Sequence, residues 1–443
     1  MDKRAKIFLT LFLTYAFFTN TYLTTNDASR FSLTAAIVEE QTFVIDGYLD
    51  TVISDWWFAK DYAVFNGRRY SDKAPLGSFL GVPIYFVVRL FTSDFGILAY
   101  FVSLFTAGVA TAAAALLIYR FGAEFTANSG VRTGLALAYG MASMPLFYGT
   151  VFFSHAFTAF FGFASFYLLF RYRKQGGEKN LALAGVSSAF AVASDYYAGL
   201  IAIVLFFYAA SISRKKAYIF LLAFLGGISL LLAYHRAAFE SPFAVPYLYS
   251  NLFSKFHTEG FYGVGLLSWK IIMNLISQLF SKWGFFFTTP FAILSLAALP
   301  RFSKTHLRET LAILSIASGL FYFTAVLGFF DAYSTRHLVP LVPFLFIPLY
   351  SIDFEKPSTG ILFAMVFIIG AGINLLGVDT FLPKVTELAT KNTMAGNNNL
   401  FGQFLMSRGI NIHYLSLAPL FLFYLVFWRH EILQGTRHLF RSG

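Results

Sequence analysis

Residues 7 to 40, IFLTLFLTYAFFTNTYLTTNDASRFSLTAAIVEE, join an apolar run directly to a polar segment. The run, residues 7–23, is long enough to cross a hydrocarbon core of about 30 Å as a helix. Just beyond its end, Asp27 and Arg30 introduce two charges. The basic residues before the run resemble the charged region of a signal peptide, but no small-x-small cleavage site follows. We therefore expect an uncleaved membrane anchor with a cytoplasmic N-terminus.

The composition extends this pattern to the whole chain. Of its 443 residues, 57% are hydrophobic and 12% are charged, against roughly 25% charged residues in soluble domains. Apolar stretches of about 17 to 25 residues recur throughout, so we predict an all-α, polytopic membrane protein and exclude soluble classes. The chain has no cysteine, which excludes thiolate catalysis and Cys-ligated metals. The net charge of +11 comes from short basic clusters between apolar runs, which indicates orientation in a membrane and argues against a nucleic-acid partner.

The basic clusters predict the topology, because loops rich in Lys and Arg face the cytoplasm. Their alternation with the apolar runs predicts about twelve transmembrane helices, in a range of about 11 to 13, with both termini cytoplasmic. The spans are expected near residues 7–23, 94–119, 133–150, 155–172, 181–196, 197–213, 217–234, 286–300, 310–330, 338–352, 360–378 and 413–428. If residues 75–91 also crossed the membrane, the later clusters would lie outside. We therefore expect that stretch to form an interfacial or partly inserted helix.

Residues 1–443 are expected to form a single transmembrane domain with long loops on the non-cytoplasmic side. The first loop holds eight of the chain's 22 acidic residues, so we place the function there. The second contains two amphipathic pieces, residues 247–256 and 266–280, which are expected to lie on the membrane surface. The three long loops are residues 24–74, 235–285 and 379–412, and residues 429–443 form a basic cytoplasmic tail.

The polar segment after the first span is expected to be helical. Asp27, Arg30 and Thr34 are spaced three and four apart, so on a helix they share one face, while Phe31 and its apolar neighbours share another. The polar face then points at water or at a substrate. The alternative is that Asp27 caps the helix that begins after it, with Arg30 within reach.

A second polar segment, DYAVFNGRRYSDKAP at residues 61–75, places charges of both signs on a glycine-containing loop before an apolar helix. Such a loop can hold a phosphate group. The alternative is a solvated hairpin whose charges neutralise one another. The candidate residues are Asp61, Arg69, Asp72 and Lys73.

Further candidates lie at the ends of predicted spans. Arg336 and His337 stand at the outer mouth of one span, where an arginine either binds an anion or reaches toward lipid head groups. His155 starts another span and either contacts substrate or has a structural role. Asp195, in SDYYAG, is an ionisable residue flanked by apolar ones near a span end, which is costly and therefore suggests function.

These segments resemble the GT-C glycosyltransferases, in particular the protein O-mannosyltransferase and aminoarabinose-transferase branch. NDASRF, followed by the basic segment that ends in KAP, resembles the first external loop of that family. STRHLVPLVPFL and SHAFTAFFGFASFYLLFRYR resemble two of its later segments. The chain ends in a short basic tail instead of the large soluble domain of oligosaccharyltransferases, so en bloc glycan transfer is not expected.

The resemblance implies that a sugar moves from a polyprenyl-phosphate donor to an acceptor hydroxyl on a glycan, lipid or protein at the non-cytoplasmic face. Asp27 is then the general base that takes the acceptor's proton, and Arg30 orients it. The leaving phosphate needs fixed cations, for which Arg336, Lys73 and Arg69 are the candidates. A single carboxylate without a nucleophilic partner favours inversion. Supporting or substrate contacts are assigned to Arg30, Asp61, Asp72, His155, Asp195 and His337.

One departure from the family bears on cofactors. The mannosyltransferase branch usually has Asp-Glu at the helix start, whereas Ala28 follows Asp27 here. No cofactor or metal site is therefore predicted, and a divalent cation, Mg or Mn, stays open.

The rival class is a lipid or glycolipid transporter or flippase, whose binding residues would lie at mid-membrane on broken helices. The predicted spans contain few central charges, which favours the enzyme. The expected location is a prokaryotic plasma membrane, with the endoplasmic reticulum as the alternative, and membrane lipids surround the chain.

Overall fold

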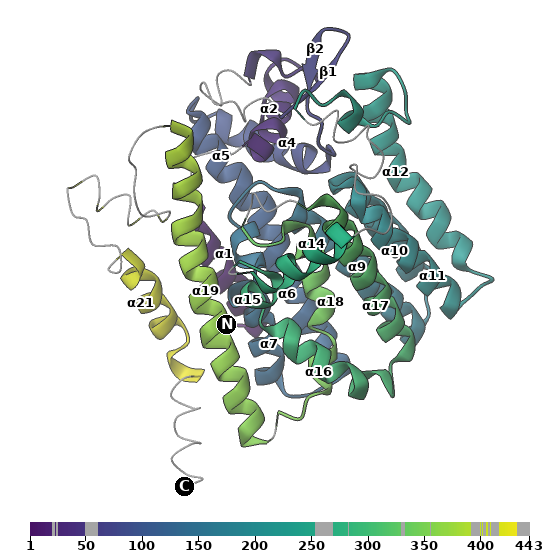
Figure 1. The fold of residues 1–443 in the computed structure, drawn as a ribbon, viewed down its shortest axis with the longest axis vertical. Helices are drawn as coiled ribbons and strands as arrows, with labels where there is room; N and C mark the ends of the chain where they lie inside the picture. The colour runs from purple at the N-terminus through teal and green to yellow at the C-terminus, as the bar shows by residue number, and fades with distance from the viewer. Residues whose placement is uncertain are drawn as a thin grey trace.

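The computed structural model describes residues 1–19, 23, 25–48, 61–252, 269–281, 283–328, 333–354, 356–390, 399, 401, 405, 408 and 416–431, with the backbone alone at 25 and 380–390. These ranges form a bundle of 18 α-helices with short 3-10 and π-helical turns and one two-stranded hairpin (Figure 1). The predicted all-α class is confirmed. Most of the third long loop, the tail beyond residue 431, and parts of the first and second loops lie outside the described residues.

Several helices are long and apolar enough to cross a membrane, as a multi-pass integral membrane protein requires. Four meet this test in the described ranges: Phe95–Glu124, Ala217–Phe239, Leu307–Leu327 and Pro357–Asp379. A fifth is added if Trp269–Thr288 and Phe291–Ser303, which meet at 85°, count as one broken span. The twelve predicted spans are therefore not shown.

Proline accounts for part of this difference, since it removes a backbone donor and clashes with the preceding turn. The predicted span 133–150 is divided into α7 (Ser129–Met141) and α8 (Pro145–Tyr148), and 286–300 into α15 (Phe285–Thr288) and α16 (Phe291–Ser303). The predicted span 338–352 contains three prolines. It forms η7 (Arg336–Leu341), α18 (Val342–Leu345) and η8 (Pro348–Ser351).

The remaining predicted spans each overlap a helix. Most bounds differ by one to five residues, but the helix at the predicted span 360–378 ends at Thr390, twelve residues later. The span from Phe95 to Glu124 runs through α5 (Phe95–Ser103), η2 (Leu104–Gly108), α6 (Val109–Phe121) and η3 (Gly122–Glu124). The others are α1 (Lys3–Phe18), α9 (Ser154–Gln175), α10 (Glu178–Ser194), η4 (Tyr196–Ala198), α11 (Gly199–Ile212), α12 (Ala217–Phe239), α17 (Leu307–Leu327), α19 (Pro357–Thr390) and α21 (Ala418–Phe427).

Close helix packing in the bundle depends on small residues, as is usual in membranes. At Gly185 in α10, an added Cβ would lie 2.2 Å from the carbonyl oxygen of Phe220 in α12. At Gly227 in α12, it would lie 2.7 Å from Cβ of Ala189 in α10. These two glycines therefore set the distance between α10 and α12.

One end of the bundle, which we call the hairpin end, carries α2 (Thr25–Glu39), the strands β1 (Ala63–Phe65) and β2 (Arg68–Tyr70), and α4 (Leu76–Arg89) (Figure 1). The strands are antiparallel and joined through Asn66 and Gly67. Both turn residues have positive φ, 50° and 74°, as the two-residue turns of hairpins require. The 14 residues of α4 span only about 21 Å as a helix, too little to cross the membrane. Its predicted interfacial position agrees with this length.

The amphipathic piece predicted at residues 266–280 corresponds to α14 (Trp269–Phe280). Asn274 and Gln278 donate hydrogen bonds to carbonyl oxygens of α17, both at 2.8 Å. On the opposite side, Trp269 and Phe280 are about 70% exposed. Because the polar side faces protein and the apolar side faces outward, α14 has the pattern of a helix with one side against lipid. Its position on the membrane surface stays a prediction.

Candidate functional site

The site begins with the polar face of α2, which packs on α4 and the loop before it. The Ser78 hydroxyl donates to the backbone oxygen of Arg30 at 2.9 Å, and the Thr34 hydroxyl donates to that of Ser78 at 3.0 Å. The hydroxyls of Ser29 and Ser71 lie 3.0 Å apart. Thr34, expected to share a face that meets water or substrate, is instead fully buried against α4. These contacts fix α2 relative to the loop that carries Asp72 and Lys73.

Asp27 lies in the first turn of α2, and its side chain is only 2% exposed. The helix begins at Thr25, two residues before Asp27, so the alternative in which Asp27 precedes and caps the helix does not match the structure. A carboxylate in a first helical turn still interacts favourably with the helix dipole. Its assignment as general base stays a prediction.

Arg30 connects α2 to two other helices. One guanidinium nitrogen donates to Ser154 Oγ, at the start of α9, at 2.9 Å. Ser154 Oγ in turn donates to Asp195 Oδ2, just after α10, at 2.6 Å. The other terminal nitrogen donates to the backbone oxygen of Asn26 at 3.0 Å, whereas Arg30 Nε is buried with no hydrogen-bond acceptor in the described residues. These contacts hold the two terminal nitrogens of Arg30 and leave Nε as a donor for a ligand.

His155 lies beside this chain, within a group of aromatic rings. Its Nδ1 is 3.2 Å from the Tyr197 hydroxyl and 3.7 Å from Asp195 Oδ2. The His337 ring is centred 5.3 Å from that of His155 and 5.4 Å from that of Tyr197. Three predicted site residues from three segments of the chain, His155, Asp195 and His337, are thus brought together.

Lys73 forms the second part of the site. Its Nζ lies 2.9 Å from Asp61 Oδ1 and 3.1 Å from Asp72 Oδ1, and all three side chains are buried. The ammonium group also lies over the Tyr247 ring, 5.6 Å from its centre. Of the two alternatives for this loop, a solvated hairpin does not describe these three residues, because they are withdrawn from water.

Asp72 is unusual among them. It is fully buried, and neither carboxylate oxygen accepts a hydrogen bond within the part of the chain that the structure describes. Burial raises the pKa of Asp72 from 3.8 to about 6, and the charge of Asp61 acts in the same direction, while Lys73 opposes them. Although Oδ1 pairs with Lys73 at 3.1 Å, a carboxylate whose oxygens accept no hydrogen bond and whose pKa is near neutrality can accept a proton from a bound hydroxyl.

Charge interactions join the two parts. The charges of Arg30, Lys73 and Arg336 all act on Asp195. Arg336, at the start of η7, also acts on His155. We refer to the whole set as the polar cluster, which comprises Arg30, Asp61, Asp72, Lys73, Ser154, His155, Asp195, Tyr197, Arg336 and His337.

Arg336 has no hydrogen-bond or ion-pair partner among the described residues, and its side chain is half-buried. A partly buried guanidinium without a protein partner is suited to an anionic ligand. Because the charge of Arg336 also acts on Asp195 and His155, we count it as a cation of the polar cluster that is available to a ligand.

Arg69 has a different environment from the other predicted phosphate ligands. On β2, its Nε donates to Asp46 Oδ1 at 2.8 Å, and a terminal nitrogen donates to the backbone oxygen of Asp46 at 2.7 Å. The pair is partly exposed on the hairpin. The contacts do not place Arg69 in the polar cluster, and its role in donor binding stays a prediction.

The residues do not fit a divalent cation at Asp61 and Asp72. The Lys73 ammonium group lies within 3.1 Å of both carboxylates, where a metal bridging them would stand. No group of three or more His, Asp or Glu side chains in the described ranges is arranged to hold a metal ion. We therefore derive no step through a metal at this position.

Several members of the site escaped the sequence analysis. Ser154 directly precedes His155, and Tyr197 lies in the SDYYAG stretch with Asp195. Their closeness in sequence to these predicted residues was the signal that could have identified them. The Tyr247 ring, over which the Lys73 ammonium group lies, is centred 5.5 Å from the Tyr196 ring. The Tyr196 hydroxyl lies 3.0 Å from His235 Nε2. These contacts bring together residues about 40 to 50 positions apart, which no local pattern indicates.

No family model and no curated protein sequence matches the chain. Solved structures match it. The Archaeoglobus fulgidus oligosaccharyltransferase in complex with Zn and sulfate has 17% sequence identity and a TM-score of 0.53, over 83% of this chain and 53% of its own. The Archaeoglobus fulgidus oligosaccharyltransferase tethered with an acceptor peptide has 14% identity and a TM-score of 0.52, over 84% and 55%.

The chain spans about half the length of these oligosaccharyltransferases. At such identities the similarity establishes the fold alone. The resemblance to GT-C glycosyltransferases predicted from the sequence is matched here only by a fold similar to that of an archaeal oligosaccharyltransferase. The mannosyltransferase and aminoarabinose-transferase branch stays a prediction. The polar cluster therefore lies in a membrane-helical chain whose fold is similar to that of an archaeal oligosaccharyltransferase.

Proposed function

We propose that this protein is a membrane glycosyltransferase that moves a sugar from a polyprenyl-phosphate donor to an acceptor hydroxyl at the non-cytoplasmic face, with inversion. The observation that carries the proposal is the polar cluster itself. Cations from α2, the loop before α4, and η7 surround buried carboxylates in a membrane protein with a GT-C-like fold. A glycosyl transfer needs both kinds of group, a base for the acceptor and cations for the leaving phosphate.

The leaving phosphate would bind between Arg336 and Lys73. Negative charge on this group grows as the glycosidic bond breaks, so fixed cations nearby lower the barrier. The guanidinium donors of Arg336 have no acceptor among the described residues. Arg30 Nε is a further buried donor without an acceptor there. Arg69 would contact the phosphate only at the edge of the site, because its ion pair with Asp46 fixes its side chain on the hairpin.

Two carboxylates compete for the role of general base. Asp27 is the residue that the sequence resemblance assigns, and its burial in the first turn of α2 agrees with a protected site. Asp72 is supported by its raised pKa of about 6 and by carboxylate oxygens that accept no hydrogen bond among the described residues, although Oδ1 pairs with Lys73. Asp195 is less suited to the role, because Ser154 donates a hydrogen bond to it and the cations of the cluster surround it.

The dependence of transfer on pH distinguishes the two bases. A base reacts in its deprotonated form, so if Asp72 is the base, transfer increases as the pH rises through about 6 and levels off above it. The rate with saturating donor, measured from pH 5 to 8, checks this. If the Asp72→Asn protein retains transfer and the same profile, Asp72 is not the base and the assignment of Asp27 stands.

The experiment that tests the function is incubation of the purified protein with a panel of polyprenyl-phosphate sugars and candidate glycan, lipid and peptide acceptors. We expect one donor to be consumed with release of the polyprenyl phosphate, and the acceptor to gain one sugar. If no donor is consumed but labelled lipid moves between leaflets of a proteoliposome, the transporter or flippase alternative is supported instead.

A further inference from the structure

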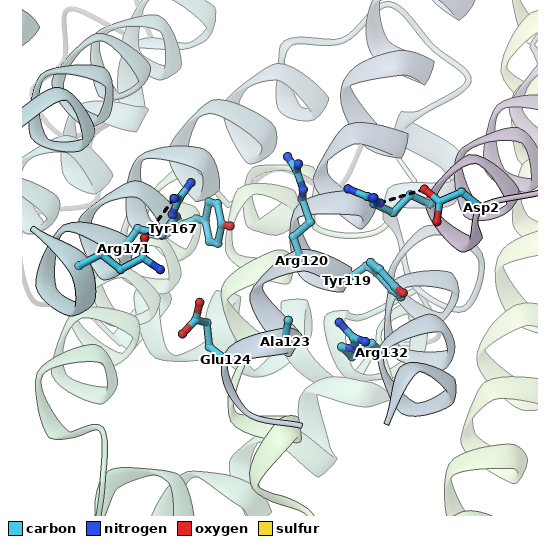
Figure 2. A pocket seen from close by; sticks show the side chains of 10 residues that line it. Asp2, Tyr119, Arg120, Ala123, Glu124, Arg132, Tyr167 and Arg171 are labelled. Atoms are coloured by element: carbon cyan, nitrogen blue, oxygen red, sulfur yellow. Dashed lines mark hydrogen bonds and ion pairs between the residues drawn. The ribbon is translucent and has the colours of Figure 1, made fainter. Parts of the chain in front are cut away.

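A basic hollow lies away from the polar cluster, at the other end of α9. It has a volume of about 480 Å³ and is lined from the ends of α1, α6, α7 and α9. Arg4, Arg120, Arg132 and Arg171 contribute four positive charges, and Asp2 and Glu124 contribute two negative ones, a difference of +2. Figure 2 shows Arg120 in the centre of this hollow, between Arg171 on one side and Arg132 on the other. We call it the arginine hollow.

The four arginines differ in how many hydrogen-bond or ion-pair partners their side chains have. Arg4 pairs with Asp2 at 3.0 Å, and Arg171 donates to the Gln175 amide oxygen at 3.1 Å. Arg120 and Arg132 form no ion pair within the ranges that the structure describes. The Arg132 guanidinium lies over the Tyr119 ring, 4.9 Å from its centre, and its Nε is buried without an acceptor. Stacking on Tyr119 thus orients the Arg132 guanidinium, whose Nε donor has no acceptor among the described residues.

The hollow is separate from the polar cluster. His155 lies at the start of α9, and Arg171 lies in its last turns. They are 16 positions apart, which corresponds to about 24 Å along a helix. The donor site of the proposed reaction and the arginine hollow therefore cannot share one phosphate group.

We propose that the arginine hollow binds a phosphate-bearing ligand. Guanidinium groups bind phosphate oxygens in a bidentate manner, and two arginines without carboxylate partners provide two such groups. The volume exceeds that needed for one inorganic phosphate, so the ligand is a phosphate ester of head-group size. Such an ester can belong to an anionic phospholipid of the surrounding bilayer or to a soluble metabolite. The proposal is independent of the glycosyltransferase function.

The alternative is that these arginines bind no specific ligand and only add to the positive charge on this side of the protein. A matched pair of variants separates the two accounts. Arg120→Gln with Arg132→Gln removes two charges from the hollow. Arg214→Gln with Lys215→Gln removes two charges from exposed residues outside it. The single variant Arg120→Gln serves as a further test, because Arg120 has no described partner whose loss would affect folding.

The experiment measures lipid retention by the full-length protein in neutral detergent, by native mass spectrometry. The probes are phosphatidylglycerol, phosphatidylcholine and, as the soluble arm, glycerol 3-phosphate. We expect the double variant in the hollow to bind the anionic probe about tenfold more weakly than the native protein, as the loss of charge-assisted hydrogen bonds implies. The Arg214 and Lys215 control is expected to stay within about twofold, since exposed charges contribute little.

The lipid probe and the soluble probe together also identify the source of the phosphate. Binding of phosphatidylglycerol without glycerol 3-phosphate supports a lipid ligand, whereas binding of both supports a site for soluble phosphate esters as well. Equal losses in the hollow and control variants, or retention of the native affinity in both hollow variants, would overturn the proposal.

Discussion

Charged side chains gather at both ends of α9, and the two groups are built in opposite ways. At the first end, Arg30 donates to Ser154, and Ser154 donates to the buried carboxylate of Asp195. At the other end, Arg120 and Arg132 line an open hollow without carboxylate partners in the described residues. Arginine is therefore held in a buried hydrogen-bond network at one end of α9 and is available to bind a ligand at the other.

The difference matters because burial changes the energetic role of a charge. A buried ion costs several kcal/mol to remove from water, so it must be compensated by neighbours. Within the polar cluster this compensation fixes positions, which is what a reaction between two bound substrates requires. An exposed arginine has little such cost and can exchange ligands. The comparison predicts that equivalent substitutions at the two ends have very different effects.

The largest effect is expected from Lys73→Met. This change leaves Asp61 and Asp72 buried beside each other without their shared cation, which is expected to lower the free energy of unfolding by about 3 to 5 kcal/mol. Thermal unfolding in detergent measures it. Arg120→Met, the matched change in the arginine hollow, is expected to stay within about 0.5 kcal/mol. Equal stabilities of the two variants would contradict the contrast drawn here.

The next effect concerns Arg336, a cation of the polar cluster that resembles those of the hollow in having no described partner. Arg336→Ala is expected to weaken binding of a polyprenyl-phosphate sugar about tenfold or more, with little change in thermal stability. Arg336→Lys is expected to restore binding only in part, because the bidentate geometry is lost. Arg301→Ala, at an exposed site, is the control. If Arg336→Ala binds the donor normally, Arg336 is a membrane anchor.

A smaller effect is expected from Gly185→Ala, which tests how α10 positions Asp195. The new Cβ would lie 2.2 Å from the Phe220 carbonyl oxygen, so α10 and α12 must separate. The expected loss of stability is about 1 to 2 kcal/mol, with reduced transfer and unchanged binding in the arginine hollow. Gly226→Ala, with nothing within 4 Å of its Cβ, is the control. Equal stability of the two variants would show that the helices adjust freely.

The sequence predicted the fold class and several residues that the structure places together in the polar cluster, because both depend on local signals. Apolar runs indicated membrane helices, and polar residues at their ends indicated Arg30, Lys73, Asp195 and Arg336. The breaks within three runs were not predicted, although Pro145, Pro290 and Pro340 are visible in the sequence. Hydropathy alone does not distinguish a span from short helices buried in protein.

The rest of the site depends on contacts between distant segments. The sequence left open whether the loop with Asp72 and Lys73 holds a phosphate group or is a solvated hairpin, and only the packing of α2 on α4 shows that both residues are buried. Likewise, the hydrogen bond from Ser154 to Asp195 needs α9 and α10 to run antiparallel in the correct register. A single sequence does not determine that register.

The assignment of Asp27 as general base is tested most directly by glycosyl transfer in Asp27→Asn. The substitution keeps the size and polarity of a side chain in the first turn of α2, so thermal stability is expected to fall by less than about 1 kcal/mol. Loss of a titratable base is expected to reduce transfer by roughly a hundredfold or more. Transfer near the native rate by the Asp27→Asn protein would contradict this assignment and leave Asp72 as the base.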